Sequence, residues 1–202
     1  MARENRKQVV SVGPYATVAD FKRIFTEDVN SLYLLSLLLA GDPEKAERCF
    51  VEGIGESTKG NRVFKEWARS WARRTIIQSA IRLIDPRQSS HDGNSKWRFR
   101  GAVDKVPIVL HAEVSAILEL APLERFVFVM SVLERYSDHD CTILLGCARR
   151  DVALTRTRAM QRLVTLLGLE DNGRMDADRE TVIELIIAQH FATPAWTSSL
   201  SL

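Results

Sequence analysis

Arginine side chains are concentrated between positions 149 and 162, in the stretch RRDVALTRTRAMQR. The five cations are Arg149, Arg150, Arg156, Arg158 and Arg162, and Asp151 is the only acid among them. A guanidinium has a fixed charge and a planar fork of donors, which suits phosphate oxygens and the edge of guanine. The stretch therefore predicts a nucleic-acid-binding helix, and a solvated basic helix without a partner is the alternative.

The residues before this stretch predict the elements that would position it. Ser137 with Asp140 three residues later is typical of a helix start, and Gly146 provides a tight turn after a short helix. A longer helix is expected from about Arg149 to Leu167, because Val152, Ala159 and Leu163 share one apolar face. A short helix, a glycine turn and a second helix predict a helix-turn-helix.

Two other stretches resemble parts of enzyme sites, and neither is complete. GIGESTKGN, at 53–61, has the glycine spacing of a phosphate loop, but Asn61-Arg62 stand where lysine and serine or threonine are needed, so we expect an ordinary loop. The acids and histidine of 138–141 could bind a metal, but they lie at a helix start, where polar caps are expected. We expect a protein that is not an enzyme, with no catalytic residues, metal or cofactor.

The composition indicates a soluble globular protein. The chain has 202 residues, of which 46% are hydrophobic and 27% charged, and a net charge of +2, so any nucleic-acid interface must depend on local clusters. Three cysteines without a CxxC pair favour reduced thiols. The most apolar window, Leu32 to Ala40, is about half the length that spans a bilayer, and the N-terminus lacks the apolar run of a signal peptide. We expect a cytoplasmic protein with no membrane contact.

Helical spacing dominates the chain, and the predicted fold is all-α. Thr17 with Asp20 resembles a capping box, Pro43 suits the first turn of a helix, and a long basic helix is expected from Phe64 to Ile84. A polar, turn-rich stretch follows that helix. The predicted organisation is a helical domain at 1–86, a flexible linker at 87–108, a second small helical domain at 109–170 and a helical extension at 171–202.

Two blocks of the sequence resemble bacterial sigma factors of the extracytoplasmic-function type. The stretch from Leu118 to Leu163 is similar to region 4 of that family, with its leucine-proline pair, Leu123-Glu124-Arg125 and Leu145-Gly146. LYLLSLLLAGDPEKAERCFVEGI and VFKEWARSWARRTIIQSAIRLI resemble consecutive parts of region 2. The two blocks occur in the family's order. The resemblance implies a factor that binds core RNA polymerase and directs it to promoter DNA.

The resemblance assigns roles to three sets of residues. The polymerase-binding set is Glu44, Glu47, Arg48 and Glu52, on a helix where Lys45, Arg48 and Val51 replace two acids and a glutamine usual in the family. The set implied for the promoter's minus-ten element is Asn61, Arg62, Lys65, Arg69, Arg73 and Arg74. The set implied for the upstream element is Arg149, Arg150, Thr155, Arg156, Arg158 and Arg162.

Aromatic residues lie among the minus-ten set. Trp67 and Trp71 either stack on unpaired bases or pack in the core, and the loop at 57–61 could form a base pocket. Two other functions stay open: a degenerate sigma-like protein that binds polymerase, an anti-sigma factor or another regulator without directing initiation, and a stand-alone helix-turn-helix regulator.

Overall fold

The fold is all-α, as predicted. The computed structural model describes residues 13–59, 62–88 and 111–168, and within these ranges the only extended pairing is an isolated bridge between Tyr15 and Phe64. The elements in order are α1 (Val18–Glu27), α2 (Val29–Ala40), α3 (Pro43–Thr58), the 3₁₀ turn η1 (Lys65–Trp67), α4 (Ala68–Ile84), α6 (His111–Leu118), α7 (Pro122–Phe128), the π-helical turn η3 (Val129–Leu133), α8 (Asp138–Leu145) and α9 (Arg149–Leu166).

Local capping explains where several helices begin. The Thr17 hydroxyl accepts from the backbone N–H of Asp20, whose carboxylate accepts from the Thr17 backbone, so the predicted capping box is confirmed. Asp42 accepts from the Lys45 N–H in front of α3, which has Pro43 in its first turn. These caps satisfy backbone donors that have no partner inside the helix.

Helix α3 continues through residues that were predicted to form a loop. The expectation of a loop at 53–61 is wrong for residues 53–58, which are helical; residues 60–61 lie outside the described ranges. Gly53 is buried, and a Cβ added there would come within 2.7 Å of Ile76 Cγ1 on α4. This glycine therefore allows two helices to approach closely, which tertiary packing decides and local propensity does not reveal.

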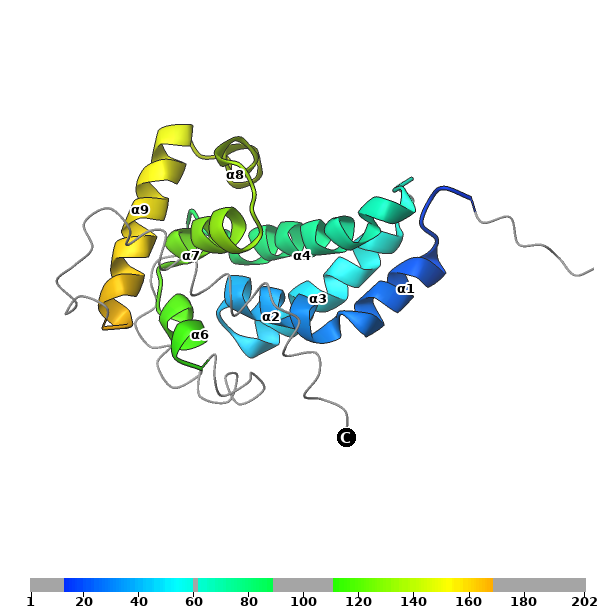
Figure 1. Ribbon diagram of the computed structural model, residues 1–202, viewed down its shortest axis with the longest axis horizontal. Coiled ribbons are helices and arrows are strands. Elements are labelled where there is room, and N and C mark those ends of the chain that lie inside the picture. Colours follow the sequence, from blue (N-terminus) through cyan, green and yellow to red (C-terminus); the bar gives the residue numbers. More distant parts are fainter. Residues whose placement is uncertain (1–12, 60–61, 89–110, 169–202) are drawn as a thin grey trace, which may run out of the picture.

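Apolar side chains from both halves of the chain form a single core cluster. Leu32, Leu37 and Leu39 of the central helix α2 are at most 1% exposed, and Phe126 and Phe128 of α7 are fully buried in the same cluster. Figure 1 shows α6 and α7 on one side of α2, with α3 and α4 beside it. None of the described helices is both long enough and apolar enough to cross a membrane.

Arg125 joins the halves at one buried point. Its guanidinium donates to the carbonyl oxygens of Leu39 and Ala40 at the end of α2, and to those of Leu118 and Leu120 at the end of α6 and just after it, at 3.3–3.4 Å. Burial lowers the pKa of Arg125 to about 10. Most of the predicted linker, 89–108, and all of the predicted extension, 171–202, lie outside the described residues.

Candidate nucleic-acid interface

A short helix, a three-residue connection and a longer helix hold the arginine-rich stretch. Ser137 caps α8 by accepting from the Asp140 N–H, and Gly146 ends it with a φ of +63°, a left-handed conformation that glycine adopts readily. Helix α9 begins at Arg149, and its Val152, Ala159 and Leu163 are at most 1% exposed. The predicted capping pattern, turn and buried face are therefore confirmed.

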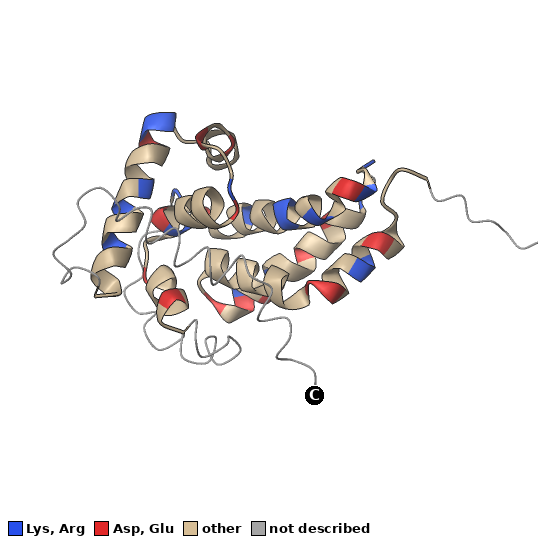
Figure 2. Ribbon diagram, in the orientation of Figure 1, with Lys and Arg blue, Asp and Glu red and all other residues tan. Residues whose placement is uncertain are grey.

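Three of the five α9 arginines have no acidic partner among the described residues. Arg149, Arg150 and Arg158 are exposed and form no ion pair with any described residue. Arg156 donates to Asp138 Oδ1 at 2.5 Å, and Arg162 lies 3.7 Å from Glu124. Figure 2 shows basic residues along the length of α9. This helix can present uncompensated positive charge to an anionic partner.

Thr155 does not share that exposure. It is 8% exposed and lines a cavity with Arg87 and Cys147, whereas its neighbour Leu154 is 46% exposed. Thr155 lies three residues after Val152 and four before Ala159, which places it on the buried face of the helix. The expectation that Thr155 contacts bases is therefore at odds with its position, and the helical spacing in the sequence already contained this signal.

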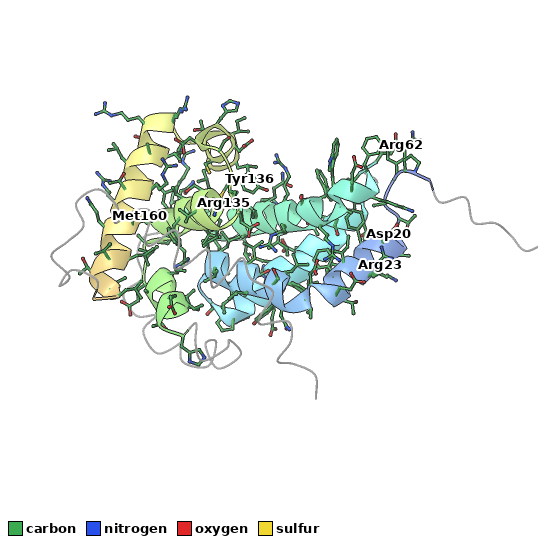
Figure 3. All side chains as sticks on the ribbon, viewed as in Figure 1. Asp20, Arg23, Arg62, Arg135, Tyr136 and Met160 are labelled. Carbon is green, nitrogen blue, oxygen red and sulfur yellow. The ribbon has the colours of Figure 1, made fainter. Side chains whose placement is uncertain are left out.

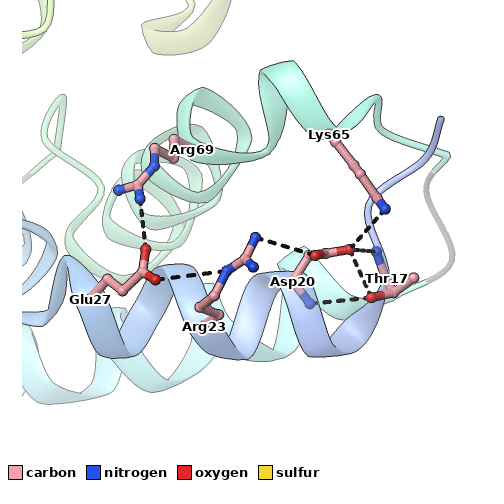
Figure 4. A network of polar contacts seen from close by, with 6 residues as sticks. All are labelled: Thr17, Asp20, Arg23, Glu27, Lys65 and Arg69. Atoms are coloured by element: carbon pink, nitrogen blue, oxygen red, sulfur yellow. Dashed lines mark hydrogen bonds and ion pairs between the residues drawn. The ribbon is translucent and has the colours of Figure 1, made fainter. Parts of the chain in front are cut away.

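The cations predicted for the minus-ten element are largely engaged within the chain. Lys65 lies 4.0 Å from Asp20, and Arg69 donates to Glu27 at 2.7 Å and to Asp28, all on or next to α1 (Figure 4). The hydrogen bond from Arg69 to Asp28 raises the pKa of Arg69. These pairs are solvent-exposed, so each is weak and can exchange for a phosphate at little free-energy cost.

Arg73 makes a more protected contact with the C-terminal half. Its guanidinium donates to Glu134, 61 residues away, and to the Ser31 hydroxyl at 2.8 Å. The Glu134 side chain is only 8% exposed. Burial alone would lower the pKa of Arg73, but the Glu134 carboxylate outweighs it and raises that pKa. Arg73 is therefore unavailable for DNA in this arrangement.

Aromatic residues lie at the start of α4 and in the segments beside it. Trp67 is 59% exposed and meets Phe64 edge-to-face at 5.4 Å between ring centroids, while Arg62 lies over the Tyr15 ring at 5.8 Å. Trp71 packs partly against the core, so of the two tryptophans only Trp67 presents an open ring. Asn61 lies outside the described residues, and the Ser57 predicted to line a base pocket is buried at the end of α3.

The outer face of α3 from Glu44 to Glu52 is exposed and forms no ion pair with other described residues. The residues assigned to polymerase binding, Glu44, Glu47, Arg48 and Glu52, are all exposed, as are Lys45 and Val51. No ion pair within 4.0 Å joins any of the charged members to another described residue. Exposed side chains of both signs, beside a 65% exposed valine, can meet a second protein surface.

Two of the three cysteines, Cys49 and Cys141, are buried. Burial raises the pKa of both Cys49 and Cys141 to about 11, so these thiols stay protonated at neutral pH. Among the described residues, no three histidine, cysteine or acidic side chains lie together as a metal site would require.

Sequence reasoning missed the residues that join the halves. In the sequence, Arg125 is notable only as part of the Leu123-Glu124-Arg125 motif, and no local pattern marks Glu134, Arg135 or Tyr136. Arg125 bonds to Leu39 and Glu134 to Arg73, each more than forty residues away, and no local spacing signals such a pair. Comparison with models of protein families, with curated proteins and with solved structures finds no match for this chain.

Proposed function

We propose that this protein is a sigma-like initiation factor that binds core RNA polymerase in the cytoplasm and carries it to promoter DNA. The observation that supports this most is the α8–α9 pair: a capped short helix, a left-handed Gly146 and a second helix with three free, exposed arginines. Such a helix fits the major groove and supplies phosphate contacts. This protein would act as a helix-turn-helix DNA-binding factor with no catalytic role of its own.

Two further surfaces would serve the same function. The exposed face of α3, with Glu44, Glu47, Arg48 and Glu52, would contact polymerase. The basic residues at the start of α4 and just before it, Arg62, Lys65 and Arg69, would take the melted minus-ten strand once the acids of α1 are displaced.

A second candidate is an interaction protein that binds polymerase or a regulator without starting transcription. The contact of Arg73 with Glu134 favours it, because a cation held in a partly buried pair is withdrawn from DNA. A stand-alone helix-turn-helix regulator would use α9 and leave α3 unused.

One reconstituted assay distinguishes the three functions. The protein is mixed with bacterial core RNA polymerase and fragmented genomic DNA, and the 5′ ends of new transcripts are sequenced. We expect new start sites, lost in the Arg150→Ala, Arg158→Ala variant and kept in the control Lys22→Ala, Arg23→Ala, which removes the same charge from α1. Polymerase binding without new starts would favour the interaction protein, and DNA binding without polymerase binding the stand-alone regulator.

A further inference from the structure

A groove of about 460 Å³ runs along α4 and is closed on one side by the C-terminal half of the chain. Its walls include Arg62, Trp67, Trp71 and Arg74 from the N-terminal half, and Arg135 and Tyr136 from the connection between η3 and α8. Figure 3 shows Arg135 and Tyr136 at that connection and Arg62 farther along the molecule. The volume is typical of sites for small molecules, which commonly lie where two packed units meet.

The aromatic side chains offer flat apolar surfaces. Trp67 is 59% exposed, so its ring is open to a partner as well as to Phe64. The indole Nε1 of Trp71 is buried and donates to no acceptor among the described residues. A buried donor without a partner is rare, and a small rotation of this indole would let it reach an acceptor in the groove. Indole faces are good platforms for a nucleic-acid base.

The charges of the groove favour an anion. Its two acids have partners inside the protein, since Glu134 pairs with Arg73, and Asp140 accepts from Ser137 Oγ at 2.5 Å. Arg135 is exposed and forms no hydrogen bond or ion pair with a described residue. Arg74, on the wall formed by α4, lies beside the Tyr136 hydroxyl of the facing wall.

Arg135 adopts a backbone conformation that an arginine does not favour. Its φ is +59°, in the left-handed position that follows a helix C-terminus and that glycine normally occupies. The N–H of Tyr136 closes this turn by donating to the Met130 carbonyl at 2.9 Å. Residues held in disfavoured conformations tend to mark functional sites, and here the strained residue is the one unpaired cation beside Tyr136.

We propose that this groove binds a nucleotide, with its base against Trp67 and its phosphate between Arg74 and Arg135. The chemistry is shared by a free nucleotide and by one nucleotide of a single strand. Because the two arginines come from different halves of the chain, bound nucleotide must also stabilise the packing of the halves. Because Arg62 and Trp67 are also assigned to the minus-ten element, binding of a strand here would rest on the proposed function, whereas binding of a free nucleotide would not.

The test measures binding of two probes to the whole protein, without polymerase or duplex DNA. The probes are ADP, by equilibrium dialysis, and a single-stranded oligothymidine of about eight nucleotides, a length within single-strand site sizes, by fluorescence anisotropy. Arg135→Gly removes the phosphate contact and relieves the left-handed strain. We expect it to weaken binding by about tenfold, as for a lost charge-assisted hydrogen bond, while raising the melting temperature of the free protein. Lys22→Ala, on the exposed face of α1 and outside the lining of the groove, should leave ADP binding unchanged.

Each outcome either shows whether the groove binds a free nucleotide or a strand, or rules the nucleotide site out. Binding of ADP that Arg135→Gly and Trp67→Ala both weaken supports a site for a free nucleotide. Binding of the oligonucleotide alone, with the same sensitivity, assigns the groove to a strand. Failure of both probes at millimolar concentration, or binding that neither substitution alters, overturns the proposal and leaves the α9-based function untouched.

Discussion

The Arg125 guanidinium lies between the ends of α2 and α6, where it donates to four backbone carbonyls and meets no described carboxylate. The carbonyl oxygens of Leu39 and Ala40 belong to the last turn of α2, where no later N–H of the helix donates to them. A cation beside them therefore also complements the helix dipole. Gly41 follows with a φ of +70°, and a Cβ on it would lie 2.6 Å from Arg125 Nη2. Arg125 and Gly41 thus depend on each other.

Replacing Arg125 with alanine should lower the free energy of unfolding by about 1–3 kcal/mol, the cost of leaving buried acceptors without donors. Urea denaturation would measure the loss, with Arg23→Ala on the exposed face of α1 as the control, whose free energy of unfolding we expect within about 0.5 kcal/mol of the parent's.

Gly41→Ala should lower the free energy of unfolding more in the parent than in the Arg125→Ala variant. In that variant only the left-handed backbone conformation is penalised, by about 1–2 kcal/mol. Additive effects of the two changes would contradict this coupling.

Asp140 makes the start of α8 sensitive to acid. The side-chain hydrogen bond from Ser137 lowers the pKa of Asp140 below its usual 3.8, because it stabilises the carboxylate. A carboxyl with a depressed pKa in the folded state contributes stability above its unfolded pKa, and that stability is lost as the pH falls through the folded value. We expect the unfolding free energy to decline as the pH falls below 3.8.

The Asp140→Asn variant should lose part of that decline, since an amide does not titrate. Denaturation from about pH 6 to about pH 3, which brackets carboxyl titration, measures the slope. Glu66→Gln is the matched control, because Glu66 is exposed and has no ion pair with a described residue. Equal acid slopes for Asp140→Asn and the parent would show that the capping carboxylate does not control acid stability.

The contact between Arg73 of α4 and Glu134 after η3 limits how much positive charge α4 can present to DNA. Glu134→Gln would release Arg73, and we expect the affinity for a DNA duplex at low salt to rise roughly tenfold, about 1.4 kcal/mol. Filter binding would measure the change. Glu56→Gln removes the same charge from an exposed pair with Lys59 and serves as the control. An increase no larger than that of the control would make Arg73 a purely structural residue.

Helix α9 is expected to dominate binding to duplex DNA. If Arg150 and Arg158 each meet a phosphate, replacing both with alanine should flatten the dependence of log K on log salt by about 1.8, at about 0.9 per contact. Anisotropy titrations at several salt concentrations would measure the slope, with Lys22→Ala, Arg23→Ala as the charge-matched control. An unchanged slope would mean that α9 is only a solvated basic helix.

The two halves of the molecule share one core cluster, so they should stay together even without a continuous chain. The polar composition of 89–105 predicts that a protease cuts there first. We expect the nicked protein to elute as one particle in size-exclusion chromatography, because α6 and α7 pack on α2 and Arg125 donates a hydrogen bond to Leu39 of α2. The Arg125→Ala, Glu134→Ala variant should separate into two fragments after cleavage. Separation of the nicked parent would contradict a stable contact between the halves.

Local signals in the sequence predicted several elements correctly. The caps at Thr17 and Ser137, the left-handed Gly146 and the buried face of α9 depend on residues within one or two helical turns, and all are observed. The all-α class follows from the same short-range periodicity. All five α9 arginines were expected to meet DNA, but only the structure shows that Arg156 and Arg162 lie beside Asp138 and Glu124.

Tertiary packing decided the rest. Gly53 was expected in a loop but lies in α3, where Ile76 on α4 leaves no room for a side chain, so this glycine serves helix packing and not a turn. Arg73 was expected to be free for DNA, yet it pairs with Glu134, 61 residues away. Spacing along a chain indicates which side of a helix is apolar, but which helix covers it, and which acid meets a given arginine, depend on residues brought together only by folding.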